Sequence, residues 1–587
     1  MDMQEIIATP LWGLYEKGRN YHRIIGTYTD TDRNYRFYNG NQWEGAKLGD
    51  VEPVQKNFIK PIVKYKQAVI HDNLYSIVFS SMNFEDRQFR KTAERICELL
   101  NGFVARAWEQ DKMDDKLRTV TKDAAINDEG IFYVYWDEEK KRPVHEVIKK
   151  NDIYYGNEND EDIQSQPYIL IRKRMPVANA REFALNEGVS EDELVFIVGD
   201  SDTHEESGEA AKLELDDMVT VIYKLYKKDG TVRFSIATKY VEIAENIDTG
   251  LSLYPVAHFV WEGKEGSARG EGEVRYLIPN QIEVNKTEMR RVLTVKQQAY
   301  PMKVADRSKI ANPAAINTVG GTIWTSGQTV DDVHKVVGII PPAQMSPDVK
   351  QLQEDLIQVT RDLAGAGDTA TGSVNPEDAS GRAILAVQQA SQAPMTEQKQ
   401  KTKSVVEDVA RIDLEHIVVY SENGLTMEEE VNDPNTGDSY YQMVTVPQSV
   451  LERVQADVKV DITPKSPYDR FAQEQTIENL LMNGLFRPDR VSELEIYYKI
   501  LPDDSVAPKT MIGEAIEYIK EQQRKIAVIN ARSQLMMQNA QKFLMEDPDG
   551  QAQQIADARM QLEEQQYAEQ EAELDEEVAE EEEEVEE

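Results

Sequence analysis

The residues of this chain that could do chemistry are scattered and form no recognised catalytic pattern. The seven histidines, among them His22, His71, His145 and His258, show no H-x-x-x-H or other metal-ligand spacing. The sequence has no phosphate-binding G-x-x-x-x-G-K-[ST] motif, so ATP hydrolysis is not expected. We therefore interpret the histidines as structural. The sequence favours a structural or interaction protein over an enzyme, with no cofactor and no metal site.

Two segments imitate functional motifs. Residues 266–274, GSARGEGEV, are glycine-rich but lack the strand–loop–helix setting of a nucleotide site, so we interpret them as a turn leading into a helix. Ser380 is not in a G-x-S-x-G pattern, and either it or Asp378 is better placed to cap a helix beginning near Gly381. Acidic residues are abundant, but no spacing marks a catalytic pair. A nuclease with carboxylate-bound Mg²⁺ is therefore the weakest alternative.

Length and charge limit the possible functions. A chain of 587 residues exceeds what one hydrophobic core usually supports, so several domains are expected. The net charge is −40, of which residues 561–587 supply −15 through fifteen Asp and Glu, leaving −25 on the other 560 residues. An acidic body argues against a broad basic face that grips duplex DNA. It does not exclude a protein that surrounds DNA without gripping it.

Cysteine content and hydropathy predict the compartment. Cys97 is the only cysteine, which excludes an intrachain disulfide framework and fits a reducing compartment. The first residues, MDMQEIIATPLWG, lack a basic region followed by an apolar run, so no signal peptide is expected. No stretch approaches the roughly 18 apolar residues of a membrane span. We expect a soluble, intracellular protein with no membrane partner.

Residues 1–265 are predicted to form an α+β domain. Helical spacing runs through residues 57–79 and continues in 86–129. Strands are predicted at 131–136 and 167–175, where the apolar period changes. The segment MVTVIYKLYKKDGTVRFSIAT predicts a β-hairpin closed at Asp229-Gly230.

The middle of the chain predicts a stalk with a small head. Residues 272–300 are helical in spacing, with Pro279 near the start, and Pro301 ends the helix. Residues 301–345 are rich in Gly, Pro and short strand-like runs. The next helix, 349–364, ends at Gly365 and carries one apolar stripe. The stripe residues are Leu352, Leu356, Val359 and Leu363. Because both helices border the head, we expect them to run antiparallel.

A polar loop and a long helix follow the stalk. The loop, residues 365–379, is rich in Gly, Thr and Ser, and the helix, 380–422, is predicted to kink at Pro394. A loop of this composition next to a kinked helix indicates a moving element that faces a space. Strands are predicted at 423–465 and helices at 466–545, before an acidic tail.

The order of these elements resembles the portal protein, or head-to-tail connector, of tailed bacteriophages. The resemblance extends from about residue 30 to 520. Four stretches carry it: FYNGNQW at 37–43, NFIKPIVKYKQAVI at 57–70, ASGRAILAVQQASQAPM at 379–395 and VDITPKSPYDRFAQEQTIENLLMNGL at 460–485.

The resemblance implies a predominantly helical α+β subunit that assembles as a ring, usually a dodecamer. The subunit would have a wing, a stem, a clip, a tunnel loop, a crown and an acidic tail. The corresponding ranges are 1–265 and 423–465 for the wing, 266–300 and 346–364 for the stem, 301–345 for the clip, 365–379 for the tunnel loop, 380–422 for the long kinked helix, 466–545 for the crown and 546–587 for the tail.

The resemblance also implies a function and its partners. The ring would form the channel at the unique capsid vertex through which double-stranded DNA is packaged and ejected without sequence specificity. It would dock the terminase large subunit during packaging and head-tail adaptor proteins afterwards, and contact the major capsid and scaffolding proteins. Its location would be the virion, after assembly in the host cytoplasm.

Two sets of residues are candidates for sites in such a ring. The tunnel loop would line the narrowest point and contact DNA through polar side chains and backbone, while its acidic residues keep the duplex sliding. Its residues are Asp368, Thr369, Thr371, Ser373, Asn375, Glu377 and Asp378. The alternative is a disordered surface loop. In the stem, Arg290, Arg291 and Lys296 are candidates to pair with Glu354 and Asp355 of a neighbouring subunit, and simple solvated charges are the alternative.

One further class of function stays open at this stage. A non-viral oligomeric scaffold or adaptor could assemble through the same helices without a DNA channel. A monomer or dimer in solution would favour that class, and a ring with a central hole would favour the portal.

Overall fold

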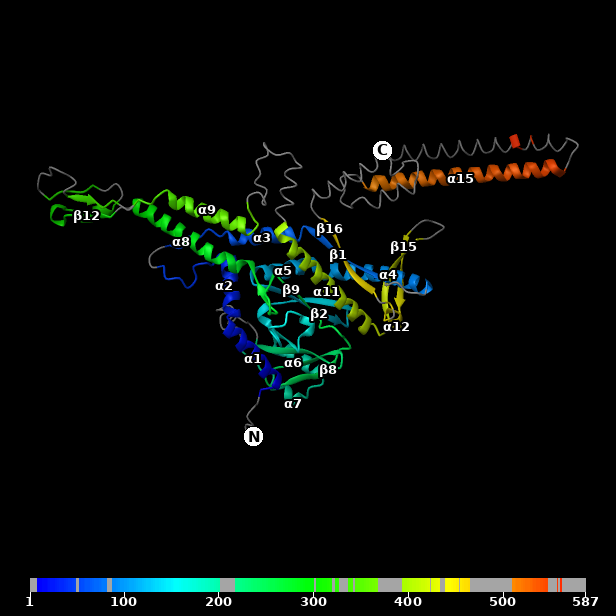
Figure 1. The fold of residues 1–587 in the computed structure, drawn as a ribbon, viewed down its shortest axis with the longest axis horizontal. Helices are drawn as coiled ribbons and strands as arrows, with labels where there is room; N and C mark the ends of the chain where they lie inside the picture. Colours follow the sequence, from blue (N-terminus) through cyan, green and yellow to red (C-terminus); the bar gives the residue numbers. More distant parts are fainter. Residues whose placement is uncertain are drawn as a thin grey trace. The chain divides into compact units, whose positions relative to one another are not determined.

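The computed structural model describes most of the chain in two compact units, Met1–Thr463 and Pro464–Glu587. The described residues are 8–48, 52–81, 87–200, 217–299, 302–318, 322–326, 336–341, 344–367, 393–422, 424–432, 439–452, 454, 456–464, 509–546, 557 and 560–561. Both helices and strands are present, as the α+β prediction requires (Figure 1). None of the helices in these ranges is long and apolar enough to cross a membrane.

Five helices begin the first unit: α1 (Pro10–Ile25), α2 (Thr27–Asn39), α3 (Ile59–Ile70), α4 (Arg87–Gln110) and α5 (Met113–Ile126). The Thr9 hydroxyl caps α1 by accepting from the Trp12 amide at 3.3 Å. Gly26, with φ of 79°, separates α1 from α2. The helix predicted over 57–79 is wrong beyond His71, because residues Asn73–Ser81 form strand β1 and pair with β16 (Ala456–Pro464). A partner so distant in sequence leaves no local signal.

Two antiparallel sheets form the centre of the unit. The first has the order β3-β2-β9, from β2 (Glu129–Asp137), β3 (Arg142–Ile148) and β9 (Val256–Val260). The second has the order β4-β5-β6-β7-β8, from β4 (Ile153–Tyr155), β5 (Ile169–Pro176), β6 (Met218–Lys228), β7 (Thr231–Ala237) and β8 (Glu242–Asp248). The predicted hairpin is confirmed as β6–β7, with φ of 57° at Asp229 and 90° at Gly230.

The remaining elements connect or cover these sheets. They are α6 (Val177–Asn186), α7 (Glu191–Leu194), η1 (Lys150–Asp152), η2 (Ile163–Ser165), β10 (Glu262–Gly263), β11 (Gly270–Glu271), α8 (Glu273–Ala299), β12 (Lys303–Ala305), η4 (Arg307–Lys309), η5 (Pro313–Asn317), β13 (Val337–Ile339), α9 (Asp348–Leu363), η7 (Ala393–Met395), α11 (Thr396–Tyr420), β14 (Leu425–Asn432), β15 (Ser439–Val446) and α12 (Gln448–Leu451). The second unit contributes α15 (Lys509–Glu546).

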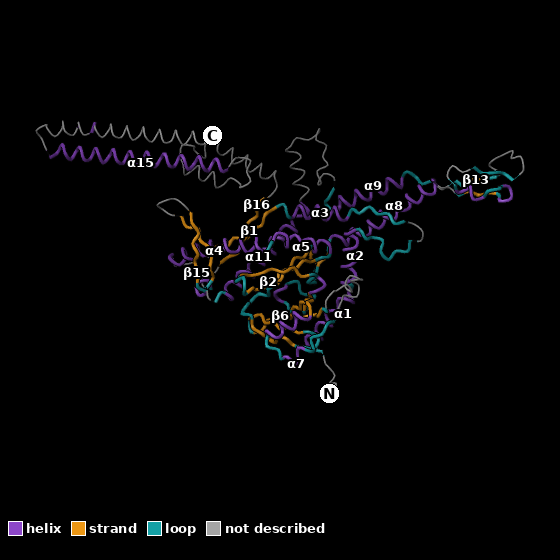
Figure 2. Tube along the Cα trace, turned by 180° about the vertical axis from the view of Figure 1, so that it is seen from behind, coloured by secondary structure: helices purple, strands orange, loops and turns teal. Residues whose placement is uncertain are grey.

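The largest core of the first unit joins helices to the first sheet. Phe132 of β2, Val120 of α5, Val274 of α8 and Val406 of α11 are buried in it, together with Trp261. Helix α11 lies along the β3-β2-β9 sheet, as Figure 2 shows from behind. Because α8 and α11 share this core, the base of the stalk and the helix after the predicted tunnel loop are both anchored to the mixed domain.

Candidate functional site

Helices α8 and α9 lie side by side and are joined by polar contacts (Figure 1). The Gln353 side chain is 2% exposed, donates to the Glu288 carboxylate at 2.8 Å and accepts from Arg291 at 2.6 Å. Two turns further along α9, the Thr360 hydroxyl accepts from the Asn280 side-chain amide at 2.9 Å. Buried polar groups stabilise only when they are paired, so these bonds fix the register of the two helices.

Charges near Glu288 reinforce this pairing. Its carboxylate lies 3.0 Å from Arg291 and 3.4 Å from Lys56. Burial raises the pKa of Glu288, but the hydrogen bond from Gln353 and the two positive charges outweigh burial, so the pKa lies below its ordinary value. Glu288 is therefore an anion that holds α8, α9 and the segment before α3 together.

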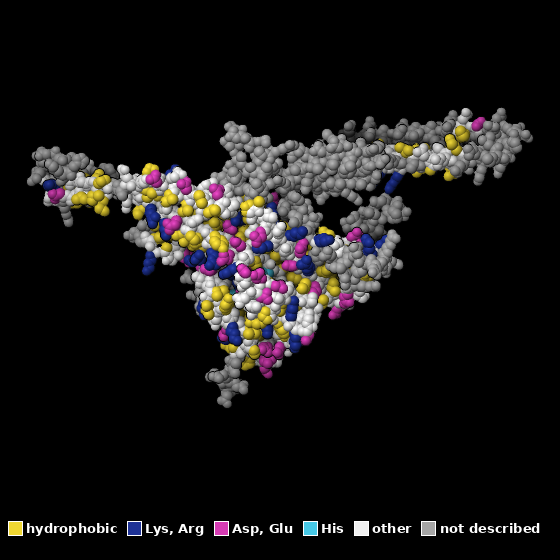
Figure 3. Space-filling model, viewed as in Figure 1, with side chains coloured by type: hydrophobic (Ala, Val, Ile, Leu, Met, Phe, Trp, Pro, Cys, Tyr) yellow, Lys and Arg dark blue, Asp and Glu magenta, His cyan; other side chains and the backbone are white. Residues whose placement is uncertain are grey.

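The apolar stripe predicted on α9 has the expected helical period but faces away from α8. Leu352 is 65% exposed, Val359 52% and Leu363 82%, while Leu356 alone packs against the core. Figure 3 shows hydrophobic side chains along this hairpin. The stripe is thus a surface that nothing described in this chain covers, and such a surface is typical of a contact with another molecule.

The structure gives the predicted stem residues partners within the same chain. Arg291 contacts Glu288 and Gln353, and Lys296 lies 2.7 Å from Glu52. Glu354 lies 3.5 Å from Lys350 and Asp355 accepts from Gln351 at 2.7 Å. The Arg290 carbonyl accepts from the Thr294 hydroxyl. Pairing of these five residues across subunits stays a prediction.

The small head between the two helices contains β12 and β13, which pair antiparallel with Val304 opposite Gly338. Ile310 and Val336 are buried in it, while other described apolar side chains are exposed: Met302 71%, Val304 56%, Trp324 66% and Ile339 60%. Its exposed side chains therefore resemble the stripe on α9 in being available to another surface.

The predicted tunnel-loop residues Asp368, Thr369, Thr371, Ser373, Asn375, Glu377 and Asp378 lie outside the described residues. Helix α9 ends as its glycine predicts, since Gly365 has φ of 70° and donates to the Asp362 carbonyl. Pro394 lies in η7, directly before α11 begins at Thr396. Residues 368–392 lie outside the description, so the predicted kink at Pro394 stays a prediction.

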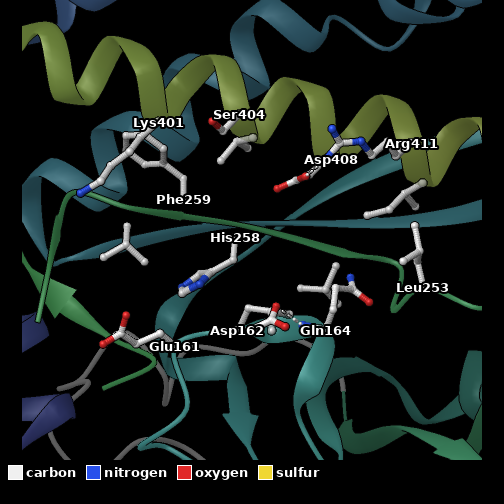
Figure 4. A pocket seen from close by; sticks show the side chains of 15 residues that line it. Glu161, Asp162, Gln164, Leu253, His258, Phe259, Lys401, Ser404, Asp408 and Arg411 are labelled. Atoms are coloured by element: carbon white, nitrogen blue, oxygen red, sulfur yellow. Dashed lines mark hydrogen bonds and ion pairs between the residues drawn. The ribbon is translucent and has the colours of Figure 1, made fainter. Parts of the chain in front are cut away.

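A cavity of about 400 Å³ lies between α11, β9 and η2 (Figure 4). Its lining side chains come from three separate parts of the sequence, so no local sequence motif predicts this cavity. The labelled lining residues are Glu161, Asp162, Gln164, Leu253, His258, Phe259, Lys401, Ser404, Asp408 and Arg411.

Two cations at this cavity are paired with carboxylates of α11. Lys401 lies 2.6 Å from Glu397, and Arg411 lies 3.1 Å from Asp408. Burial raises the pKa of Asp408. Within the described ranges, no group of three or more His, Cys, Asp or Glu could hold a metal ion.

The glycine-rich segment at 266–274 contains a residue that sequence patterns missed. Arg269 is 6% exposed and donates to Glu158 at 2.8 Å, to the Ile153 carbonyl at 3.0 Å and to Glu129. Burial and the Arg269 charge lower the pKa of His22, also buried here, to about 4. The network ties α1 to both sheets, so His22 is structural, as expected of a buried histidine with these partners.

Comparison with known proteins matches most of the chain to one family. The family model described as phage P22-like portal protein matches residues 27–580. A comparison with curated proteins found no match. The matched range includes both helices of the stalk, the head, the predicted tunnel loop at 365–379 and α11.

Proposed function

Because this chain belongs to the phage P22-like portal protein family, we propose that it forms the ring-shaped channel at the unique capsid vertex of a phage. Double-stranded DNA would enter the capsid through this channel during packaging and leave through it during ejection. The proposed ring is a closed homo-oligomer, usually a dodecamer in this kind of protein. Closed rings arise when one surface of a subunit contacts a different surface of its neighbour.

The parts of the subunit are assigned by their order along the chain. We assign the wing to 1–265 and 423–465, the stem to α8 and α9, the clip to 301–345, the tunnel loop to 365–379 and the crown to 466–545. The observation that carries the assignment is the α8–α9 hairpin with its small head. Its outer stripe, Leu352, Val359 and Leu363, supplies the apolar surface that neighbouring stems need.

The charge of the chain supports passage of DNA without retention. Each Lys or Arg that contacts a phosphate releases counterions and adds affinity independent of sequence. A subunit with net charge −40, repeated around a ring, provides few such contacts and repels the duplex from the wall. Asp368, Glu377 and Asp378 place this repulsion in the tunnel loop.

The proposal also defines partners and a location. The clip would meet the terminase large subunit during packaging and head-tail adaptor proteins afterwards, while the wing and crown would meet the major capsid and scaffolding proteins. The chain would act as a structural component and not as an enzyme. It would be located in the virion after assembly in the host cytoplasm.

Sedimentation velocity of the purified chain tests the proposal. A single closed multimer that persists on dilution supports a portal ring. A monomer or dimer at all concentrations contradicts it and favours the oligomeric scaffold or adaptor without a channel.

A further inference from the structure

One buried chain of charges joins α11 to the rest of the wing. The ring of His145, on β3, lies between two carboxylates: Nδ1 is 3.0 Å from Asp111 and Nε2 is 2.9 Å from Asp413. Asp111 follows the end of α4, and Asp413 is on α11. All three side chains are nearly inaccessible, at 2%, 6% and 4% exposure for His145, Asp111 and Asp413.

This geometry needs a proton on each ring nitrogen of His145. A neutral imidazole donates from one nitrogen and presents a lone pair at the other, which would face a carboxylate. The imidazolium donates to both. Burial lowers the pKa of His145, but the charges of Asp413 and Asp111 and their hydrogen bonds outweigh it and raise the pKa to about 9.

The two carboxylates differ in how much they depend on His145. Asp111 also lies 2.7 Å from Arg142 of β3 and 3.6 Å from Lys116 of α5. For Asp413, by contrast, the described ion pair is the one with His145. His416 lies one turn further along α11. Its ring donates a hydrogen bond to the Ile412 carbonyl at 2.8 Å, and no hydrogen bond to Asp413 is among the described contacts.

Other groups facing the cluster leave this balance unchanged at neutral pH. Burial lowers the pKa of His416, so that ring is neutral. Burial raises the pKa of Tyr135 on β2, so its hydroxyl is neutral. A buried carboxylate without a counter-charge is strongly unfavourable. Among the described ion pairs, Asp413 has the one with His145, so a neutral His145 leaves Asp413 without a described counter-charge. The group that must then move to reach water is on α11.

Near the cavity, α11 is also held by Glu415, which accepts from the backbone amides of Ser252 at 2.5 Å and Leu253 at 3.1 Å. Ser404, Asp408 and Arg411 face the cavity of about 400 Å³ (Figure 4). The side of α11 that carries Asp413 also has Thr402, Val406, Val409 and His416, and all five residues are buried. The charged contact described on that side is Asp413–His145.

We propose that Asp111, His145 and Asp413 form a proton-dependent latch that holds α11 against the wing, and that loss of the proton from His145 loosens α11 while the sheets stay folded. The latch acts within one subunit, so it does not require the ring. It bears on the proposed function only because α11 directly follows η7 and comes after the segment assigned to the tunnel loop, 365–379, in the chain.

The direction of the pH effect follows from linkage. The pKa of His145 is higher in the folded chain, about 9, than its ordinary 6.5, so its stabilisation is complete below pH 6.5 and is lost as pH rises through 9. With these two pKa values, raising the pH from 7 to 10 lowers the ratio of latched to loosened α11 by about 70-fold.

Hydrogen exchange detected by mass spectrometry tests the latch. Peptides covering 405–420 are compared with β6–β7 peptides of the same sample, so that the pH dependence of intrinsic exchange cancels. We expect α11 to lose protection relative to β6–β7 between pH 7 and pH 10. In His145→Gln, α11 should already be weakly protected at pH 7 and show no further relative loss.

Two further variants keep the test decisive. Asp413→Asn, which removes the charge with nearly the same shape, should abolish the alkaline loss even where His145→Gln fails to fold. The matched control is His71→Gln, because His71 lies outside α11 and its ring contacts the Thr121 hydroxyl at 2.7 Å. This variant should behave as the parent chain.

An unchanged ratio of hydrogen-exchange protection between α11 and β6–β7 up to pH 10, or equal loss of protection in both regions, would overturn the latch. The oligomeric state tests the portal function separately.

Discussion

Replacing the outer stripe of α9 with polar residues should weaken the proposed ring. The perturbation is the triple variant Leu352→Gln, Val359→Thr, Leu363→Gln. These side chains are 65%, 52% and 82% exposed in the isolated subunit, so their replacement should leave the fold of the subunit intact. In the ring, each would be buried against a neighbouring stem.

The expected loss follows from the area these side chains would bury. Full burial of a Leu or Val side chain stabilises by roughly 2 kcal/mol. Scaled by the three exposed fractions, the stripe contributes about 4 kcal/mol to each subunit contact. A loss of that size weakens each contact by roughly a thousandfold.

Sedimentation velocity over a dilution series measures this loss. The parent chain should remain a closed multimer at concentrations where the triple variant has dissociated. The dissociated subunits of the variant should unfold at the same temperature as those of the parent. The matched control is Leu185→Gln, Val195→Thr on α6 and after α7, where the side chains are 49% and 66% exposed. This control should assemble normally. A triple variant whose multimer resists dilution as well as the parent would refute the assignment of α9 to the ring contact.

Three other predictions follow from the charge and packing of the subunit. Arg269→Met should destabilise the first unit by about 3–5 kcal/mol in chemical denaturation, because it removes the guanidinium paired with the buried Glu129 and leaves that carboxylate the contact with His258; a change under about 1 kcal/mol would contradict this. Gly130→Ala should cost about 1–3 kcal/mol in the same assay, since its new methyl group would meet the backbone of α5, and unchanged stability would disprove that close contact. Reversing Asp368 and Asp378 to Lys should slow DNA packaging in vitro through new phosphate contacts, with the largest effect at low salt; unchanged packaging rates would remove the loop from the channel wall.

Local patterns in the sequence predicted the elements that depend on local forces. The β6–β7 hairpin follows from Asp229-Gly230, whose backbone takes the positive φ that a tight turn requires. The stalk helices follow from apolar period and from Gly365, which ends α9. Strand β1 was misread as helix, because its identity depends on pairing with β16, far along the chain. Short apolar runs do not by themselves distinguish helix from strand.

In the candidate site, too, local features could be predicted from the sequence and contacts between distant segments could not. The period of the α9 stripe could be read from Leu352, Val359 and Leu363, but not which side it faces, because buried Gln353 and Thr360 take the inner side through specific hydrogen bonds. The Asp111–His145–Asp413 contacts and the Arg269 network join distant segments, so spacing could not reveal them. The function was predicted from the order of the elements and their resemblance to portal proteins, and the family match supports it over residues 27–580.

Imaging of the purified full-length chain by negative-stain electron microscopy tests the central claim most directly. The account predicts closed rings, seen end-on with one central hole wide enough for a DNA duplex and seen from the side with a narrow projection formed by the stems and clips. Particles without a central hole, or compact monomers and dimers under conditions where the chain is folded, would contradict it.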